Sequence, residues 1–223
     1  MDGDDDQSYA ILSHQWDTQE VLFTDVEKGM SAIREGFSKV VGAIELSRRD
    51  GHKFLWIDTC CIDKSSSAEL SEAINSMFRW YQEATVCYVY LSDVSSLPKE
   101  ETFRDQFASS AWFTRGRTLR KLIAPQALQF HSATWRLLGY RIALDPPVSA
   151  ITGIAQDILD GSRPLSETSI ARRMSWAARR KTHRVEDTAY CLMGLFNVNT
   201  PSALRRRQQS LHTVARRDHQ NHK

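Results

Sequence analysis

The sequence of 223 residues lacks a long hydrophobic run. None of its apolar segments approaches the roughly 18 to 20 residues that a membrane-spanning helix needs. Its first residues are acidic, whereas a secretory signal peptide begins with basic residues and continues into an apolar stretch. We therefore expect a cytoplasmic protein without a membrane span.

Cysteine and histidine are scarce and scattered. The four cysteines lie in apolar segments and form no C-x-x-C pair, so we expect reduced, buried thiols. Only His219 and His222 lie close together, in a polar stretch that offers no second pair of ligands. The sequence therefore predicts no metal site and no tightly bound cofactor. The cysteines are Cys60, Cys61, Cys87 and Cys191.

A large excess of charge of one sign is absent as well. The 29 Lys and Arg residues nearly balance the 27 Asp and Glu residues, which argues against a histone-like polycation. The balance hides two ends of opposite sign that we expect to be disordered, an acidic leader (1–8) and a basic tail (201–223). The tail could bind nucleic acid, but it has no aromatic side chains to stack on bases, so this alternative is disfavoured.

Between these ends, the apolar residues predict alternating strands and helices. Short continuous apolar runs predict four buried strands, at 9–14, 54–58, 86–91 and 127–130. Apolar residues three and four positions apart predict helices at 30–49, 66–84, 112–123, 148–161, 170–180 and 185–196. Ser66 and Glu69 predict a capping box at the start of the second helix, and the polar stretch 95–105 predicts a linker.

Strands that alternate with helices predict an α/β fold with a parallel sheet flanked by helices. We expect one domain (9–200), made of an α/β core (about 9–132) and a C-terminal helical extension (about 145–198). If the strands are parallel, the polar residues at their ends (Ser13 and His14, then Asp58) lie along one edge of the sheet. Open α/β sheets usually bind their ligands at this edge.

Five blocks of sequence, in order, closely resemble the fungal heterokaryon incompatibility (HET) domain. The blocks are 10–16 (Ala-Ile-Leu-Ser-His-Gln-Trp), 56–64 (Trp-Ile-Asp-Thr-Cys-Cys-Ile-Asp-Lys), 73–81, 112–116 with 122–125, and 184–192. The resemblance implies a cytosolic module that triggers programmed cell death when genetically different fungal cells fuse. It also implies attachment, in many cases, to a nucleotide-binding receptor that bears repeats.

HET domains in turn resemble TIR domains, which have a flavodoxin-like fold, assemble into oligomers and in many cases cleave NAD. Two segments carry this likeness here, 57–59 (Ile-Asp-Thr) and 110–112 (Ser-Ala-Trp). The resemblance implies Trp, Gln and a catalytic Glu at the positions that Arg117, Arg120 and Lys121 occupy. It further implies NAD as a substrate or ligand and assembly into a homo-oligomer.

Lysine at position 121 is unsuited to this chemistry. Breaking the bond between nicotinamide and ribose builds positive charge on the sugar, which a neighbouring carboxylate stabilises and an ammonium opposes. A pair of unit charges about 4 Å apart is worth about 4 kcal/mol at an effective dielectric constant of about 20, so the rate would fall by several powers of ten. We therefore predict a weak or inactive NAD hydrolase. The alternative is an active glycohydrolase that uses Asp58, Asp63 or Glu83 instead.

The remaining candidate residues have a functional and a structural interpretation. In the functional interpretation a nucleotide pocket forms at this edge, with Trp16 as a surface on which a base stacks. The other residues of this pocket would be Ser13, His14, Asp58, Asp63, Trp112, Arg117 and Arg120. Alternatively, the residues at the end of the first strand cap it and fill the core, and the two aspartates cap turns. The three basic residues, spaced i, i+3 and i+4, form either a solvated helix face or a contact with a phosphate or an acidic partner.

Three charged residues in the last block, Arg184, Glu186 and Asp187, are expected to support the site structurally, with Arg184 and Asp187 forming an ion pair. A pairing of the His14 imidazole with the thiol of Cys60 or Cys61 is disfavoured relative to buried, unreactive thiols.

Overall fold

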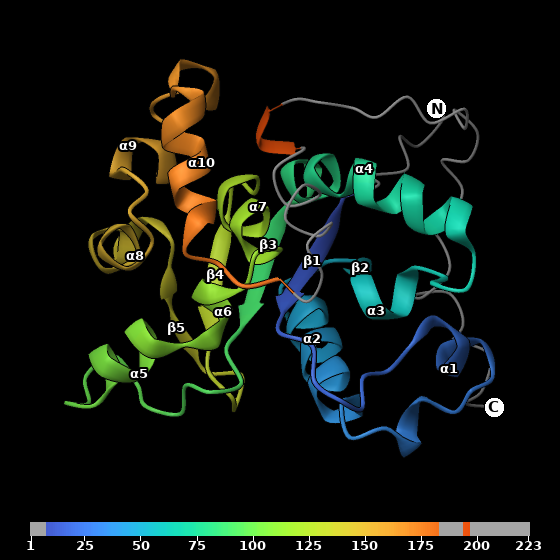
Figure 1. Ribbon diagram of the computed structural model, residues 1–223. Coiled ribbons are helices and arrows are strands. Elements are labelled where there is room, and N and C mark those ends of the chain that lie inside the picture. The colour runs from blue at the N-terminus through green and yellow to red at the C-terminus, as the bar shows by residue number, and fades with distance from the viewer. Residues whose placement is uncertain (1–7, 183–193, 197–223) are drawn as a thin grey trace, which may run out of the picture.

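The computed structural model describes residues 8–182 and 194–196 (Figure 1). Three predictions therefore lie outside the described residues: the acidic leader apart from Ser8, the basic tail, and the supporting group Arg184, Glu186 and Asp187. Of the predicted helix at 185–196, only the 3₁₀ turn η4 (Gly194–Phe196) is described.

A five-stranded sheet in the order β2-β1-β3-β4-β5 forms the centre of the molecule. Its first four strands are parallel, and they correspond to the four apolar runs of the sequence. The strands are β1 (Tyr9–His14), β2 (Phe54–Ile57), β3 (Val86–Tyr90), β4 (Leu128–His131) and β5 (Leu137–Tyr140). The predicted α/β fold with a largely parallel sheet is confirmed.

The fifth strand was not predicted from the sequence. It pairs with β4 in the antiparallel direction, and the register shifts between Phe130 and His131. Its four residues include Gly139 and show neither a continuous apolar run nor a regular alternation of apolar and polar positions, which are the two sequence patterns of a strand. After β4 the chain therefore turns back in a hairpin and does not cross over through a helix.

Helices cover both faces of the sheet (Figure 1). On one face α2 (Phe37–Arg49) packs its residues Val40, Ala43 and Leu46 on alternate residues of β1 and β3. On the other face α4 (Ser67–Glu83) and α7 (Thr118–Ile123) pack on the intervening residues of the same strands. This alternation of side chains along a strand accounts for the continuous apolar runs in the sequence.

Helix boundaries differ from the predictions in several places. The helix predicted at 30–49 starts only at Phe37, because the 3₁₀ turn η1 (Ser31–Ile33) occupies its first part. The helix predicted at 112–123 is divided into α6 (Ala111–Thr114) and α7. The Ser66 hydroxyl caps α4 as predicted, but the Glu69 carboxylate accepts from the backbone N–H of Asp63, so the capping box is half formed.

Three short α-helices occupy stretches that the sequence did not mark as helical. α1 (Phe23–Glu27) lies in the connection after β1, and α3 (Asp58–Cys61) follows β2 without a connecting loop. α5 (Phe103–Ser109) overlaps the predicted linker and buries Phe103 and Phe107. All three are too short for a helical periodicity to stand out in the sequence.

The C-terminal helical extension packs on the same core as α4 and α7. The helix predicted at 148–161 ends early, at Gly153, whose φ of 70° is typical of a helix C-terminus. Val148, Ile158 and Trp176 join the core from this extension. Its elements are η2 (Ile142–Leu144), α8 (Asp145–Thr152), α9 (Gln156–Leu159), η3 (Leu165–Glu167) and α10 (Ile170–Ala178). None of the helices that the structure describes is long and apolar enough to cross a membrane.

Candidate functional site

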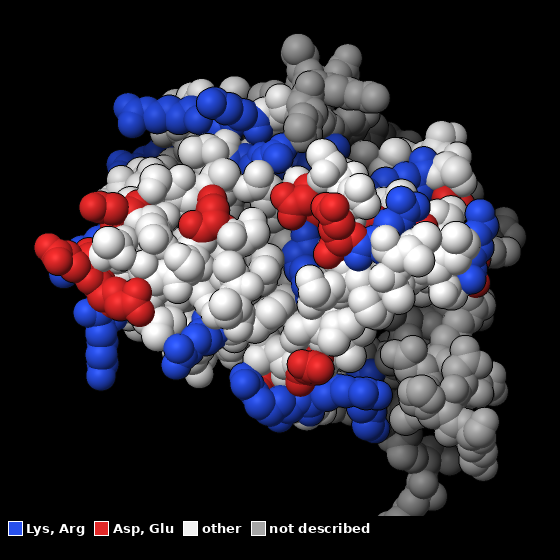
Figure 2. Space-filling view, turned by 90° about the horizontal axis from the view of Figure 1, so that it is seen from below, with Lys and Arg blue, Asp and Glu red and all other residues white. Residues whose placement is uncertain are grey.

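The carboxyl ends of β1, β2 and β3 meet at one edge of the sheet, as predicted for parallel strands. Figure 2 views the molecule from below Figure 1, the side toward which the arrows of β1 and β3 point. On this face acidic and basic side chains are interspersed among broad uncharged areas, without an extended patch of one sign. The charges that distinguish this edge lie beneath the surface.

A buried ion pair joins Asp58 to Lys121. Asp58 follows β2 directly, and Lys121 projects from α7, so two elements 63 residues apart in the chain meet here. The Lys121 ammonium lies 2.8 Å from Oδ2 of Asp58, and only 3% and 2% of the two side chains are exposed. The indole N–H of Trp16 donates to the same carboxylate, 3.1 Å from Oδ1. Both oxygens of Asp58 are thus engaged by groups of the protein itself.

This pairing controls the charge of Asp58. Burial is the largest single effect and would raise the pKa of its carboxyl, but the charge and hydrogen bond of Lys121, together with His14 and Lys64, outweigh it and hold the pKa well below its usual range. Asp58 is therefore ionised at neutral pH, and its charge is neutralised by the adjacent ammonium. If one partner were removed, the other would be left as a buried, uncompensated charge, which typically lowers the stability of the fold by about 3 to 5 kcal/mol.

A second buried group lies beside the first and consists of His14, Glu20 and Lys39. The Lys39 ammonium lies 2.6 Å from Oε1 of Glu20, and Nε2 of His14 lies 3.6 Å from the other oxygen. Burial lowers the pKa of His14 in spite of the neighbouring carboxylates, so the imidazole is neutral at neutral pH. Burial would raise the pKa of Glu20, but its contacts with His14 and Lys39 lower it to about 2. Each buried carboxylate of this edge therefore has its own lysine.

Trp16 does not offer a free stacking surface. The Lys64 ammonium lies 3.7 Å from the centroid of its indole ring, and the guanidinium carbon of Arg117 lies 5.1 Å from it. These are cation–π contacts, and they occupy the ring that the prediction assigned to a nucleotide base. The indole N–H is bonded to Asp58, so Trp16 is engaged at both its face and its edge.

Ser13 and Trp112 are hydrogen-bonded to each other. The indole N–H of Trp112 donates to the Ser13 hydroxyl at 3.0 Å, and both side chains are buried, with 1% of Trp112 and none of Ser13 exposed. This bond fastens α6 to the end of β1. In the described structure these two side chains are bonded to each other beneath the surface, and their use in a nucleotide pocket stays a prediction.

The basic residues of α7 do not form a solvated face, and that interpretation of the sequence is wrong. Arg117 is the N-cap of α7, so only Arg120 and Lys121 lie within the helix, and only 1% and 2% of them are exposed. Arg120 donates to the carbonyl oxygen of Ile74, 3.3 Å away on α4. The two residues thus connect α7 to the neighbouring elements beneath the surface.

The remaining candidates at this edge have local structural roles. The Asp63 carboxylate accepts hydrogen bonds from the backbone N–H and the hydroxyl of Ser65, which is the turn-capping arrangement. Cys60 donates to the carbonyl oxygen of Val21, and burial raises its pKa to about 12, so no thiolate is available near His14. Cys60 and Cys87 are buried, as expected, and burial raises the pKa of the Cys87 thiol to about 12, whereas Cys61 is only partly buried; that these thiols are unreactive stays a prediction.

A shallow hollow opens beside these buried groups. Its volume is about 180 Å³, whereas ligand pockets usually measure about 300 to 1,000 Å³. Neither His14, Asp58 nor Lys121 lines it. It is lined by Asp17, Gln19, Glu35, Gly36, Ser38, Lys39, Tyr90 and Ser92. In this conformation the edge is closed over its charged groups and has no room for a dinucleotide at this hollow.

Comparison with known proteins agrees with the motifs at this edge. The family model described as "Heterokaryon incompatibility protein (HET)" matches residues 9–131, which include all the elements from β1 to β4. The chain belongs to the HET family. Within that match lie both members of the Asp58–Lys121 pair and the residues of the second buried group.

One relative of the HET chain is the "Vegetative incompatibility protein HET-E-1" of Podospora anserina. The two are 46% identical over 199 residues, which cover 86% of the present chain and 15% of that relative. The chain thus corresponds to less than a sixth of the length of the relative that it matches. No solved structure matches the chain significantly.

Three residues of this HET edge were missed by the sequence analysis: Glu20, Lys39 and Lys64. Lys39 could have been found, because it precedes Ala43 by four positions and Leu46 by seven on the buried face of α2. Glu20 and Lys64 lie in connecting segments, where no periodicity applies. No group of three His, Cys, Asp or Glu side chains within the described part of the chain is placed to hold a metal ion.

Proposed function

We propose that this chain is the HET module of a fungal vegetative incompatibility protein and acts in non-self recognition that leads to programmed cell death. We further propose that it acts in the cytoplasm through contacts with other copies of itself or with a nucleotide-binding repeat receptor, and not by cleaving NAD. The similarity to HET-E-1, whose name states vegetative incompatibility, supports the first part. The chemistry of the carboxyl edge supports the second.

The observation that carries the proposal is the ion pair between Asp58 and Lys121. Cleavage of NAD requires a carboxylate whose negative charge faces the developing cation on the ribose. In this chain an ammonium occupies the position at which the TIR resemblance implies the catalytic Glu, and it neutralises the carboxylate of Asp58 at 2.8 Å. Of the carboxylates proposed at this edge, Asp58 is buried and paired with Lys121, and Asp63 accepts hydrogen bonds within its own turn from Ser65.

The alternative, an active glycohydrolase, would need Asp58, Asp63 or Glu83. Asp58 is buried and fully bonded, and Asp63 caps a turn. Glu83 lies at the far end of α4, close enough to Tyr9 at the start of β1 to affect its pKa, and hence at the opposite edge of the sheet. These positions favour the non-catalytic proposal.

Self-association would need an exposed surface that another copy can cover. The connection between β1 and α2 exposes three large apolar side chains within twelve residues, with 37% of Leu22, 46% of Met30 and 66% of Ile33 accessible. We propose that this segment contributes to self-association. Sedimentation of the purified chain should then show a concentration-dependent oligomer that Met30→Ser with Ile33→Ser weakens. Oligomers that are unchanged in this variant would exclude the segment.

The enzymatic part of the proposal is tested by incubating the purified chain with NAD and measuring the nicotinamide released. We expect no release above that of a heat-inactivated sample. Turnover at the rates typical of TIR enzymes would overturn the proposal. Cell viability on expression gives the second readout, and we expect death to occur without depletion of cellular NAD.

Back-substitution tests the assignment of position 121. The triple change Arg117→Trp, Arg120→Gln and Lys121→Glu restores the residues that the family pattern implies. If the folded variant gains NAD cleavage, the three basic residues are what disable the site. Lys28→Glu, the same substitution as Lys121→Glu but at an exposed residue, serves as the control.

A further inference from the structure

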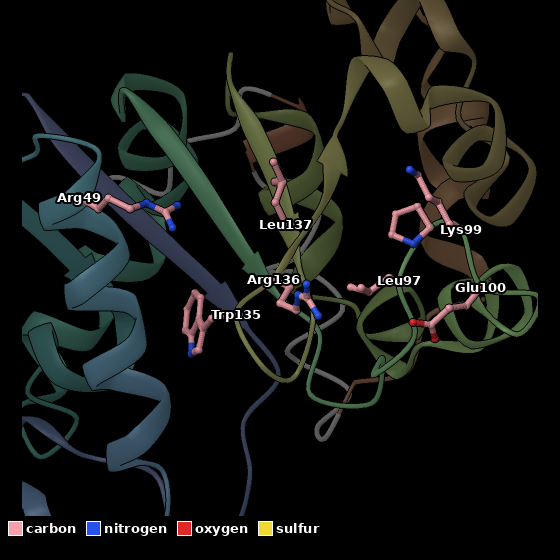
Figure 3. A pocket seen from close by; sticks show the side chains of 8 residues that line it. Arg49, Leu97, Lys99, Glu100, Trp135, Arg136 and Leu137 are labelled. Carbon is pink, nitrogen blue, oxygen red and sulfur yellow. The ribbon is translucent and has the colours of Figure 1, made fainter.

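A second hollow lies apart from the carboxyl-edge site. Its volume is about 540 Å³, which is within the range of ligand pockets, and it is partly open to solvent. Three segments border it: the end of α2, the loop after β3 and the hairpin between β4 and β5 (Figure 3). It shares no lining residue with the carboxyl-edge site. It is lined by Arg49, Leu97, Pro98, Lys99, Glu100, Trp135, Arg136 and Leu137.

The hairpin wall of this hollow is held in a costly conformation. Trp135 has a φ of 60°, in the left-handed region that large side chains rarely adopt. Such strain costs on the order of 1 to 3 kcal/mol and persists only where the surroundings enforce it. Here the indole stacks on Tyr90, with ring centroids 4.7 Å apart, and it lies against Gly42 of α2, where a Cβ atom would collide with it. The packing of Trp135 thereby fixes the neighbouring Arg136 and Leu137.

The irregular pairing of β4 and β5 exposes an apolar side chain at the hollow. The register shift beside His131 leaves Leu138 buried at 4% exposure, while Leu137 keeps 42% of its surface exposed. Leu137 and Leu97 line the same hollow from opposite segments (Figure 3). The hollow therefore has an apolar wall that water covers in the unliganded chain.

The charges of the hollow are unbalanced. Three cations, Arg49, Lys99 and Arg136, stand around it together with one carboxylate, Glu100. The side chains of Lys99 and Arg136 make no hydrogen bond or ion pair with any residue in the ranges 8–182 and 194–196. Arg49 contacts the carboxylate of Asp50 at 3.4 Å while 70% of its side chain stays exposed. Three cations against one carboxylate leave an excess of positive charge beside the apolar wall, which suits a ligand that combines an anion with an apolar part.

We propose that this hollow is a binding site for a small organic phosphate that carries an apolar or planar group. Guanidinium groups bind phosphate through two parallel hydrogen bonds, and an ammonium adds a point charge. The phosphate lies between Arg136 and Lys99, and the organic part packs against Leu97 and Leu137. This site is independent of the proposed closure of the carboxyl edge, and it would give the chain a ligand-dependent stability.

Calorimetric titration of the full chain at low salt tests the proposal, with AMP and inorganic phosphate as the two probes. We expect AMP to bind in a saturable way and more tightly than phosphate, because only AMP covers the apolar wall. Lys99→Gln with Arg136→Gln should weaken AMP binding about tenfold or more, the effect expected for lost charge-assisted contacts. The control is Lys28→Gln with Arg172→Gln, which removes two exposed charges elsewhere and should change it less than twofold.

A third variant separates the apolar wall from the charges. Leu137→Ser should weaken AMP binding and leave phosphate binding unchanged, and urea unfolding of each variant verifies that it is folded. Three outcomes would overturn the proposal: no saturable AMP binding, equal losses in the paired variant and its control, or binding of a Glu-rich peptide but not of AMP. The last would identify the hollow as a docking site for an acidic protein segment.

Discussion

Replacing Lys121 by methionine removes the ammonium that neutralises Asp58 and keeps a side chain of similar length. At the observed separation of 2.8 Å, two unit charges attract each other by about 6 kcal/mol at an effective dielectric constant of about 20. Part of this attraction offsets the cost of burying the lysine itself, which the methionine avoids. We therefore expect Lys121→Met to lower the free energy of unfolding by about 3 to 5 kcal/mol at pH 7.

The pH dependence of this loss follows from the pKa of Asp58. In the parent chain this pKa is lower in the folded than in the unfolded state, so the pair stabilises fully above the unfolded value of about 3.9 and less as the pH falls below it. In Lys121→Met the strongest of the lowering effects is lost while burial, the largest effect, remains, so the pKa rises and protonation at low pH relieves the unpaired charge. The difference in stability between the two proteins should thus be greatest near neutrality and shrink as the pH falls toward about 4.

Urea unfolding between pH 7 and pH 4 measures this difference, and thermal unfolding should show a midpoint lowered by roughly 6 to 20 °C. Lys28→Met, at an exposed position, is the matched control. The double variant with Asp58→Asn should recover most of the loss, because it removes both charges together. A loss below about 1 kcal/mol, or one that does not change with pH, would refute the reasoning.

Two further predictions concern packing and thiol reactivity. Gly42→Ala should lower the free energy of unfolding by about 1 to 3 kcal/mol, because the added methyl group collides with the indole of Trp135; urea unfolding measures it, and an unchanged midpoint would show that the indole shifts freely. In a background with Cys61→Ser and Cys191→Ser, the two remaining thiols, Cys60 and Cys87, should react with a thiol reagent only after urea unfolding, because burial raises the pKa of each to about 12. Rapid labelling of the folded chain, followed by absorbance, would contradict this.

Local patterns predicted the parallel part of the sheet. The runs at β1, β2, β3 and β4 are continuously apolar because helices cover both faces of those strands, and a run of that kind is visible in the sequence without knowledge of its neighbours. The parallel order then placed Ser13, His14 and Asp58 at one edge, as the structure confirms. β5 escaped prediction because an edge strand of four residues with a register shift has no such pattern.

The internal chemistry of the edge could not be predicted, because it depends on contacts between distant segments. The i, i+3, i+4 spacing of Arg117, Arg120 and Lys121 placed them on one face of a predicted helix, and a solvated face is the usual interpretation of clustered charges. Whether a lysine faces water or a carboxylate is decided by which strand end lies beneath it, here that of β2. The pairing of Glu20 with Lys39 likewise joins a loop to the buried face of a helix.

The long sequence separation of these contacts has a consequence for the synthesis of the chain. Trp112 is synthesised 99 residues after its partner Ser13, and Lys121 is synthesised 63 residues after Asp58. At the usual rate of about 5 to 20 residues per second, the interval of 63 residues lasts about 3 to 13 s. Until then the nascent sheet has a carboxylate that cannot be buried in its charged form, so the end of β2 must stay hydrated. The emergence of α7 is therefore the event that allows this edge to close, and a truncated product that ends before it would keep its sheet open to water.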